Sequence, residues 1–340
     1  MPIAEGALVQ ALEPFRGFVL ASMIFTLQQS GLVPDLDEGR TLDELCERHG
    51  LDRARLAATV DYLVAAGLVE RSYDGLLRRT QYARGFDEAS AWYEMMVGGY
   101  GETFLSLGSH LAAGTPPAPR AGGFVSRGSC GISMHDSIPL LRTLLAQTGR
   151  PYTRLVDLGC GSGVYLTELC KDYPTMTAVG IEPHPDGARA AREWVESQGL
   201  SDRVVIEQKG ALEWLGDPEN SPDLAVLAFV IHEVLGQEGE EGVRRLLDTL
   251  FDAAPDLDLA VVDIDLRSGD AASMAHPLAQ AYYNAYFLMH PFTSQRLETR
   301  EWWEKLFEEC GLTVVASGVT DPAMDSTAFE VAWVLRRGDR

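Results

Sequence analysis

Leu155-Val-Asp-Leu-Gly-Cys-Gly-Ser-Gly163 is the stretch of this chain that decides the fold. A short apolar run ends in an acid, three glycines follow at alternate positions, and residues 164–171 continue with helical character. A second apolar run, Ala178-Val-Gly-Ile-Glu182, ends in another acid. The order predicts a strand, a glycine turn, a helix and a second strand, because glycines let a backbone turn sharply and approach a ligand that a Cβ would block.

The spacing of these glycines separates two classes of nucleotide site. The dinucleotide fingerprint GxGxxG needs its third glycine one position later, where Val164 stands, to seat a pyrophosphate on a helix N-terminus. At the end of the second strand, Glu182 can accept both hydroxyls of a ribose. The D-x-G-x-G-x-G pattern therefore favours a nucleoside with a cationic amino-acid end. Its members are Asp157, Gly159, Gly161 and Gly163.

This motif resembles the first motif of the class I S-adenosylmethionine (SAM)-dependent methyltransferases. The resemblance implies that SAM is the cosubstrate, bound by the acid, the glycines and Glu182, with Ala211 and Phe229 as further contacts. One departure is that the acid-Ala pair that commonly binds adenine in these enzymes reads Lys209-Gly-Ala211 here.

Length and composition are those of an ordinary globular protein with room for two domains. The chain has 340 residues, of which 46% are apolar. No stretch approaches the ~20 apolar residues of a membrane span, and we expect no signal peptide because the N-terminal residues lack a basic-then-apolar pattern. The five cysteines lack CxxC pairing and disulfide-framework spacing. We therefore expect reduced thiols and a cytoplasmic location.

The formal net charge of −22 limits the partners. Such a charge repels phosphates at long range, so we expect no nucleic-acid partner and no anionic membrane partner. It is compatible with a cationic small substrate, although solubility alone would also explain it.

The N-terminal part is predicted to be mainly helical. Residues 7–29 are apolar on more than one face, with a break or kink expected at Pro14. Since such a helix must be buried and little nearby can cover it, we expect a partner subunit, most simply in a homodimer.

A helix–turn–helix and a wing follow this helix. Thr41-Leu-Asp-Glu44 is a capping box, a second helix runs over residues 53–66, and residues 68–71 and 76–80 form a small β-wing. This shape makes a ligand-sensing winged-helix regulator the alternative from another functional class. Residues 41–84, however, hold seven acids and seven basic residues, and so no basic stripe to meet phosphates. The segment resembles the winged-helix dimerisation domains of small-molecule methyltransferases, which implies domains at 1–148 and 149–340.

The second half alternates strands and helices, which implies a parallel sheet covered on both faces. Two C-terminal runs supply an antiparallel edge pair, so the fold class is α/β, a Rossmann-like methyltransferase sheet. After Glu182 the expected strands are 204–208, 224–231, 259–264, 312–317 and 329–336.

Polar side chains at the end of the fourth apolar run mark the expected substrate site. Ligands of open α/β sheets lie beyond the carboxyl ends of the strands, here at Phe229-Val-Ile-His-Glu-Val234. Placing the polar pair His232-Glu233 next to a buried strand costs free energy, which favours a functional role for the pair. Another histidine, His290, lies in an aromatic segment before Pro291. Two isolated histidines do not by themselves define a metal site, since HxxxH or HExxH spacing is the stronger signal.

A narrower resemblance covers nearly the whole chain. Phe124-Val-Ser-Arg-Gly-Ser-Cys-Gly-Ile-Ser133, the His-Glu pair, Leu235-Gly-Gln237 and Phe287-Leu-Met-His-Pro-Phe292 look like the 2-oxo acid C-methyltransferases of antibiotic and other natural-product biosynthesis, most closely the 2-ketoarginine methyltransferases. The resemblance implies that His232 and His290 ligate a metal, a divalent ion or iron, and that Arg127 faces the substrate carboxylate. Glu233 stands where the aromatic enzymes carry an aspartate.

The chemistry implied by this resemblance is methylation of the β-carbon of 5-guanidino-2-oxopentanoate, which requires a stabilised enolate. We assign catalysis to His232, Glu233, Arg127 and His290. The base is open among His135, Glu233 and a metal-bound hydroxide, and the carboxylate for the guanidinium tail is open among Glu102, Glu298 and Asp325. N-methylation of the guanidino group of free arginine is the alternative within the same fold. Substrate contacts are expected from Tyr100, Arg127, Ser129, Tyr283 and Tyr286.

Overall fold

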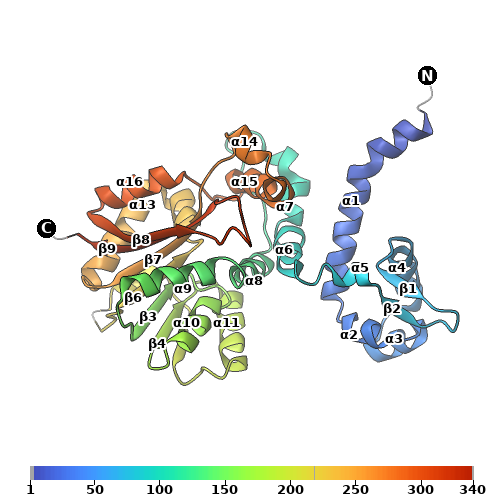
Figure 1. Ribbon diagram of the computed structural model, residues 1–340, viewed down its shortest axis with the longest axis horizontal. Coiled ribbons are helices and arrows are strands. Elements are labelled where there is room, and N and C mark those ends of the chain that lie inside the picture. The colour runs from blue at the N-terminus through green and yellow to red at the C-terminus, as the bar shows by residue number, and fades with distance from the viewer. Residues whose placement is uncertain (1–3, 218, 339–340) are drawn as a thin grey trace. The chain divides into compact units, whose positions relative to one another are not determined.

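A seven-stranded sheet forms the core of the larger of two compact units. The computed structural model describes residues 4–217 and 219–338, with one unit extending to Gly99 and the other starting at Tyr100 (Figure 1). The strand order is β5-β4-β3-β6-β7-β9-β8, with β9 antiparallel to both of its neighbours and the remaining pairs parallel. The strands are β3 (Arg154–Leu158), β4 (Thr177–Ile181), β5 (Val204–Glu207), β6 (Leu224–Ala228), β7 (Asp258–Ile264), β8 (Leu312–Val319) and β9 (Glu330–Arg337).

This sheet is the expected Rossmann-like methyltransferase fold with an antiparallel edge pair. Its central strands are buried on both faces, as their continuous apolar sequences require. The helices of this unit are α7 (Gly101–Ser106), α8 (Gly122–Ser133), α9 (Ser137–Thr148), α10 (Val164–Asp172), α11 (Pro185–Ser197), α12 (Ala211–Leu215), α13 (Ile231–Ala253), α14 (Ala271–Met274), α15 (Asn284–Met289) and α16 (Arg300–Glu309), with the short turns η2 (Leu107–His110), η3 (Ala279–Tyr283) and η4 (His290–Phe292).

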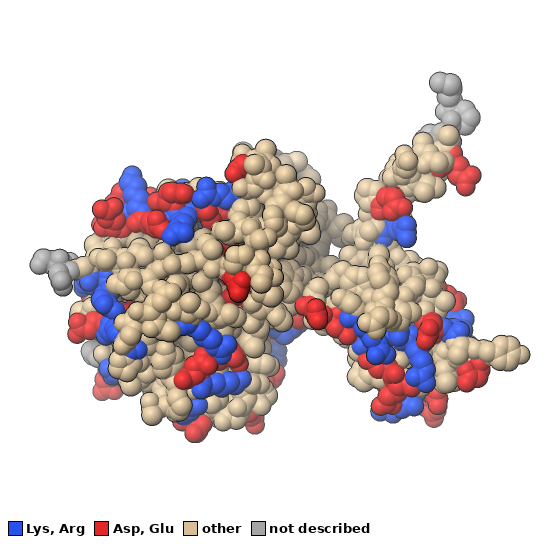
Figure 2. Space-filling view, viewed as in Figure 1, with Lys and Arg blue, Asp and Glu red and all other residues tan. Residues whose placement is uncertain are grey.

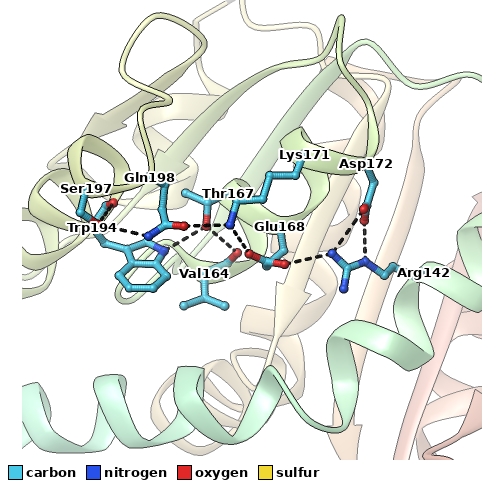
Figure 3. Close-up of polar contacts among 9 residues, drawn as sticks. All are labelled: Arg142, Val164, Thr167, Glu168, Lys171, Asp172, Trp194, Ser197 and Gln198. Carbon is cyan, nitrogen blue, oxygen red and sulfur yellow. Dashed lines mark hydrogen bonds and ion pairs between the residues drawn. The ribbon is translucent and has the colours of Figure 1, made fainter.

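Two apolar cores lie on opposite faces of the sheet. One joins the strands to α9, α10 and α11, and the other joins them to α12, α13 and α16. The first helical layer is also tied together by polar contacts (Figure 3). Arg142 of α9 donates to Asp172 and Glu168 of α10, at 2.5 and 3.0 Å. Trp194 of α11 donates its indole N–H to Thr167 of α10 at 2.9 Å. These contacts hold α10, which begins at the glycine turn, against the sheet.

The boundary of the second unit differs from the sequence-based one. The division expected at residues 148/149 lies inside this unit, since the compact units separate at Gly99/Tyr100. The reason is packing: α9 buries Ile138, Leu141 and Leu144 in the same core as the central strands. The segment 100–148 therefore belongs structurally with the sheet.

The fourth strand of the parallel set is shorter than the apolar run 224–231. β6 ends at Ala228, and α13 begins at Ile231. Phe229 lies between them with a left-handed φ of +57°. The chain therefore turns abruptly from strand to helix, which places His232 and Glu233 in the first turn of α13.

The first unit contains a helix pair followed by a hairpin. Both bonds of the Thr41/Glu44 capping box are present, at 3.3 and 2.7 Å, which confirms that prediction. The antiparallel strands β1 and β2 form the expected hairpin. The elements are α1 (Glu5–Gln29), α2 (Val33–Glu38), α3 (Leu42–His49), α4 (Arg53–Ala65), β1 (Val69–Arg71), β2 (Leu77–Arg79), α5 (Gln81–Arg84), α6 (Ser90–Tyr93) and η1 (Glu94–Gly99).

Helix α1 departs from two expectations. It is continuous through Pro14, so of the expected break or kink the break does not occur, and the kink stays a prediction. Proline removes one backbone hydrogen bond, and a 25-residue helix retains the others. It is also the one helix of residues 4–217 and 219–338 that is long and apolar enough to cross a membrane, although the sequence was expected to hold no such stretch. Length and composition alone are weak grounds for a membrane span.

Candidate active site

The glycine turn after β3 has the geometry that its sequence requires. Gly159, Gly161 and Gly163 have φ values of +88°, +54° and +80°, a region that L side chains rarely adopt. A Cβ on Gly159 would lie 2.7 Å from Cγ2 of Val230, so this turn packs directly against the segment that follows β6. The predicted strand–turn–helix is confirmed, and it lies beside the rim that carries His232.

Two buried acids, Asp157 and Glu182, face this turn, and within residues 4–217 and 219–338 neither forms an ion pair with a lysine or arginine. Glu182 accepts from the backbone N–H groups of Gly161 and His184, at 3.1 and 2.9 Å. Burial and the nearby charge of Glu182 raise the pKa of Asp157 to about 8, and one carboxylate oxygen of Asp157 has no hydrogen-bond partner. Burial also raises the pKa of Glu182. Such a site favours a cationic ligand, because a positive charge would offset the cost of burying both acids.

The rim beyond β6 brings the two predicted histidines together. The rings of His232 and His290 are both 1% exposed, and their centroids lie 5.2 Å apart. Nδ1 of His232 lies 2.8 Å from a carboxylate oxygen of Asp263 in β7. Nδ1 of His290 lies 2.6 Å from the carbonyl oxygen of Tyr286. Because each Nδ1 has an acceptor, the remaining nitrogen of each ring, Nε2, is available for other contacts.

The two imidazoles differ electrostatically. Burial lowers the pKa of His290 well below its usual value, and the neighbouring His232 lowers it further, so its ring is neutral. Burial also opposes the charged form of His232, but the carboxylate of Asp263 outweighs it and raises the pKa. Nε2 of His290 is buried and has no hydrogen-bond partner. An orphaned, neutral imidazole nitrogen is a natural ligand for a metal or a substrate group.

Glu233 is held by an arginine that the sequence analysis did not single out. The guanidinium of Arg120 binds both oxygens of Glu233, at 2.8 and 3.1 Å. The loop before Arg120 is fixed by backbone acceptors: Ala118 donates its N–H to Phe292 at 2.7 Å, and Thr103 donates its hydroxyl to Pro119 at 2.6 Å. Burial would raise the pKa of Glu233, but Arg120 keeps it below its usual value, so Glu233 is a carboxylate.

A second group of acids, one half-buried and two buried, lies where β9 meets the start of α9. It comprises Asp136, Asp325 and Glu330, which we call the acidic cluster. Burial raises the pKa of Asp136 to about 6, and burial together with Asp136 raises that of Glu330 well above its usual value. No ion pair of residues 4–217 or 219–338 joins these three acids to an arginine or lysine. Like the pair at the glycine turn, the cluster lacks a cation.

Tyrosines of η3 and α15 connect the acidic cluster with the histidines. Tyr283 donates its hydroxyl to Asp325, and the ring of Tyr286 lies 4.1 Å from that of His290. The charges of Asp136 and Glu330, and the phenol of Tyr100, all act on the phenol of Tyr282. The buried Tyr100 in turn donates to the side chain of Gln295 at 3.4 Å, next to His232. One aromatic wall therefore runs from the acids to the histidine pair.

Other predicted residues lie elsewhere. Arg127 is exposed, with its guanidinium over the ring of Phe124, and its role at a substrate carboxylate stays a prediction. Ser129 lies on the same helix, α8, which approaches the glycine turn through Ser126. Glu298 is paired with Arg296. Ala211 begins α12 directly after β5, while His135 and Glu102 are exposed.

Residues that the sequence analysis missed complete the site. They are Arg120, Asp136, Asp263, Gln295 and Glu330. Asp263 had a detectable signal, since an acid inside the apolar run of β7 is expensive to bury. Arg120 lies in a Pro/Gly-rich loop, whose position no local pattern predicts.

Comparison with known proteins matches this geometry. A family model described as a methyltransferase domain covers residues 133–317. The chain is 38% identical to the 2-ketoarginine methyltransferase of Streptomyces arginensis, over 98% of this chain and 97% of the relative. The chain belongs to the class I SAM-dependent methyltransferases.

More distant relatives of this methyltransferase extend along nearly the whole chain. It is 22% identical to the indolepyruvate C-methyltransferase of Streptomyces griseus, over 96% of this chain and 94% of the relative. The solved structure of human N-acetylserotonin methyltransferase in complex with SAM has the same fold, with a TM-score of 0.69 at 16% identity and 100% coverage of both chains. SAM is accordingly the cosubstrate of this methyltransferase, and the glycine turn with Glu182 is its predicted site.

Two substitutions separate cosubstrate binding from chemistry. Glu182→Ala removes the predicted ribose acceptor and should weaken SAM binding by about tenfold or more. His232→Ala should abolish turnover and leave SAM affinity within about twofold, because the histidine lies at the substrate rim. Isothermal calorimetry with SAM, combined with a turnover assay, checks both. Normal SAM binding by the Glu182 variant would refute its assignment.

Proposed function

We propose that this methyltransferase transfers a methyl group to the β-carbon of 5-guanidino-2-oxopentanoate, or 2-ketoarginine. The observation that carries the proposal is that chemically opposite groups lie at the two ends of the aromatic wall. An arginine and two histidines lie at the SAM end, and unpaired acids lie at the other end of an aromatic wall. The substrate named for the 38% identical relative has complementary ends, a keto acid and a guanidinium.

The chain's own groups suit enolate chemistry. The guanidinium of Arg120 can bind a carboxylate bidentately, which orients the keto acid. Glu233, an anion beside it, is positioned to accept the β-proton. Where no metal is held, a protonated His232, backed by Asp263, can supply the positive charge that the developing enolate oxygen requires. The β-carbon then attacks the methyl group, the carbon–sulfur bond breaks with its electrons on sulfur, and S-adenosylhomocysteine leaves while the proton on Glu233 passes to solvent.

His232 and His290 also fit the metal that the resemblance implies. Each ring has its Nδ1 engaged, which is how histidine ligands are oriented in metal sites, and Nε2 of His290 is buried without a partner. Within residues 4–217 and 219–338 no third Asp, Glu, His or Cys joins them to form a metal cluster. A bound divalent ion or iron would supply Lewis-acid polarisation of the keto oxygen.

Methyl-labelled SAM identifies the acceptor. The protein is incubated with 5-guanidino-2-oxopentanoate or with L-arginine, with and without a chelator, and the labelled carbon is located by NMR. We expect label on C3 of the 2-oxo acid, none on arginine, and loss of activity with chelator if a metal is held.

Transfer to a guanidino nitrogen of arginine, indifferent to chelator, would contradict both C-methylation and the metal.

A gel shift with genomic fragments tests the regulator alternative. The face drawn in Figure 2 carries both acidic and basic side chains and no continuous basic stripe, which argues against a DNA-binding regulator.

The acidic cluster is the proposed holder of the guanidinium tail. A guanidinium presents five N–H donors in a planar fork that suits several carboxylates at once. Its positive charge would offset the cost of ionising Asp136 and Glu330 together, which now keeps both pKa values raised. Of the three acids that the sequence analysis left open for this role, Asp325 is the one found in the cluster.

Asp136→Asn should raise the thermal stability of the fold and weaken binding of the guanidino substrate. The folded-state pKa of Asp136, about 6, lies above its usual 3.8, so ionisation destabilises the fold as pH rises from about 4 to 6 and above. Asparagine also remains a good N-cap for α9. We expect the variant to melt higher than the wild type at pH 8, with the difference shrinking towards pH 4, and to raise KM for the guanidino substrate about tenfold. A variant that melts lower at pH 8 with an unchanged KM would contradict this role.

A second copy of the chain is the proposed partner of α1. Leu8, Val9, Leu12, Phe15 and Phe18 on this helix are between 44% and 63% exposed. Its charges at Glu13 and Arg16 are paired with each other, so the remaining surface is apolar on several sides. A contiguous apolar surface of this kind favours burial against another chain.

Replacing Phe15 and Phe18 by aspartate should turn a dimer into a monomer, because it would bury two charges at the proposed interface. Light scattering coupled to gel filtration measures the mass, with Leu105→Asp, at another exposed apolar position, as the control that stays dimeric. A wild-type protein that is monomeric would contradict dimerisation. Binding of the wild-type protein to lipid vesicles through α1 would contradict it as well.

A further inference from the structure

The turn of residues 293–296 packs against α13 in an unusually close backbone contact. Ser294 has a left-handed φ of +57°, which L residues rarely adopt. A Cβ on Gly236 of α13 would lie 2.3 Å from the carbonyl oxygen of Ser294 and 2.7 Å from Cα of Gln295. The backbone N–H of Arg296 donates to the carbonyl oxygen of His232 at 3.0 Å. Backbone strain of this kind clusters at functional sites, where it fixes the position of a reactive or binding group.

What this contact positions is the side-chain amide of Gln295. The amide is 5% exposed, and its nitrogen donates to an oxygen of Glu233 at 2.9 Å and lies 3.4 Å from Nε2 of His232. Its oxygen accepts from the hydroxyls of Thr293 and Tyr100, at 2.7 and 3.4 Å. Because the carboxylate of Glu233 can only accept, the amide nitrogen must face it, and the amide oxygen then accepts from the two hydroxyls.

We propose that Gln295 is a positioning residue that keeps Glu233 aimed at the β-carbon during the reaction, an inference that rests on the proposed C-methylation. In the structure Glu233 accepts hydrogen bonds from both Arg120 and Gln295. An incoming substrate carboxylate competes with Glu233 for the same guanidinium, because both are planar anions that Arg120 can bind bidentately.

When Arg120 turns towards the substrate, Gln295 remains as the donor to Glu233. The neutral amide then holds the carboxylate in place through its 2.9 Å hydrogen bond, without competing for the substrate's own carboxylate as a cation does. Glu233 thereby changes from the partner of an ion pair into an oriented base. Gly236, within the Leu235-Gly-Gln237 segment, contributes by leaving room for the strained turn.

The test is Gln295→Met, which keeps the volume and removes the amide, with Gln147→Met on the exposed face of α9 as the matched control. We measure kcat and KM with 5-guanidino-2-oxopentanoate, SAM affinity by calorimetry, and exchange of the β-hydrogens in D₂O with S-adenosylhomocysteine in place of SAM. We expect kcat and the exchange rate to fall by about tenfold or more, while KM and SAM affinity stay within about twofold. The control should match the wild type in every measurement.

Gln295→Glu provides a second variant of nearly the same shape, and thermal melting checks that both are folded. It should show the same loss, because a second carboxylate would repel Glu233. Unchanged kcat and exchange in a folded variant, or a rise in KM alone, would overturn the role of Gln295 and leave the proposed function intact. A wild type inactive on the 2-oxo acid would overturn the proposed function, and the role of Gln295 with it.

Discussion

Buried carboxyl groups that form no ion pair with a lysine or arginine among the described residues are the constraint on which this site depends. Asp157 and Glu182 lie at the glycine turn, and the acidic cluster lies at the far end of the aromatic wall. Ionising buried carboxylates costs free energy that only a nearby cation returns. The sulfonium and ammonium of SAM would lower this cost at the first group if SAM binds at the predicted site, as a guanidinium would at the second. Glu233, between them, already has its cation, Arg120.

Backbone geometry converts this charge pattern into a reactive arrangement. Left-handed residues stand on both sides of the histidine pair, Phe229 before α13 and Ser294 after η4. Each marks a point where the chain bends sharply to aim its neighbours at the same space. Glycines at 159 and 236 lack the Cβ that would prevent these approaches. Replacing either glycine by a larger residue would displace the reactive side chains without changing their chemical identity.

Local patterns were sufficient to predict most of the fold. Alternating apolar runs and helical segments predicted the parallel sheet and its antiparallel edge pair, and the glycine spacing predicted the SAM turn. His232 was found because an imidazole directly after a buried strand is costly. The compact units separate at a different position from the expected domain boundary. In sequence α9 looks like a linker, and only its packing against β8 and β9 shows that it belongs to the sheet unit.

The missed residues share a physical reason. Arg120, Gln295 and Glu330 acquire their roles from long-range contacts, such as the 113 residues that separate Arg120 from Glu233. No periodicity or short motif encodes a contact across that distance. Arg127 was chosen by motif matching within α8, whereas the guanidinium on Glu233 comes from the preceding loop.

Recognition of one substrate by both of its ends is the central claim, and a comparison of two substrates tests it most directly. The 2-oxo acid with a guanidino terminus is compared with the ureido analogue, which has the same length and shape but no charge. A desolvated charge pair contributes about 2–5 kcal/mol, so kcat/KM for the guanidino acid should exceed that for the ureido acid by at least about thirtyfold. Equal kcat/KM values would contradict the claim that the acidic cluster holds a guanidinium.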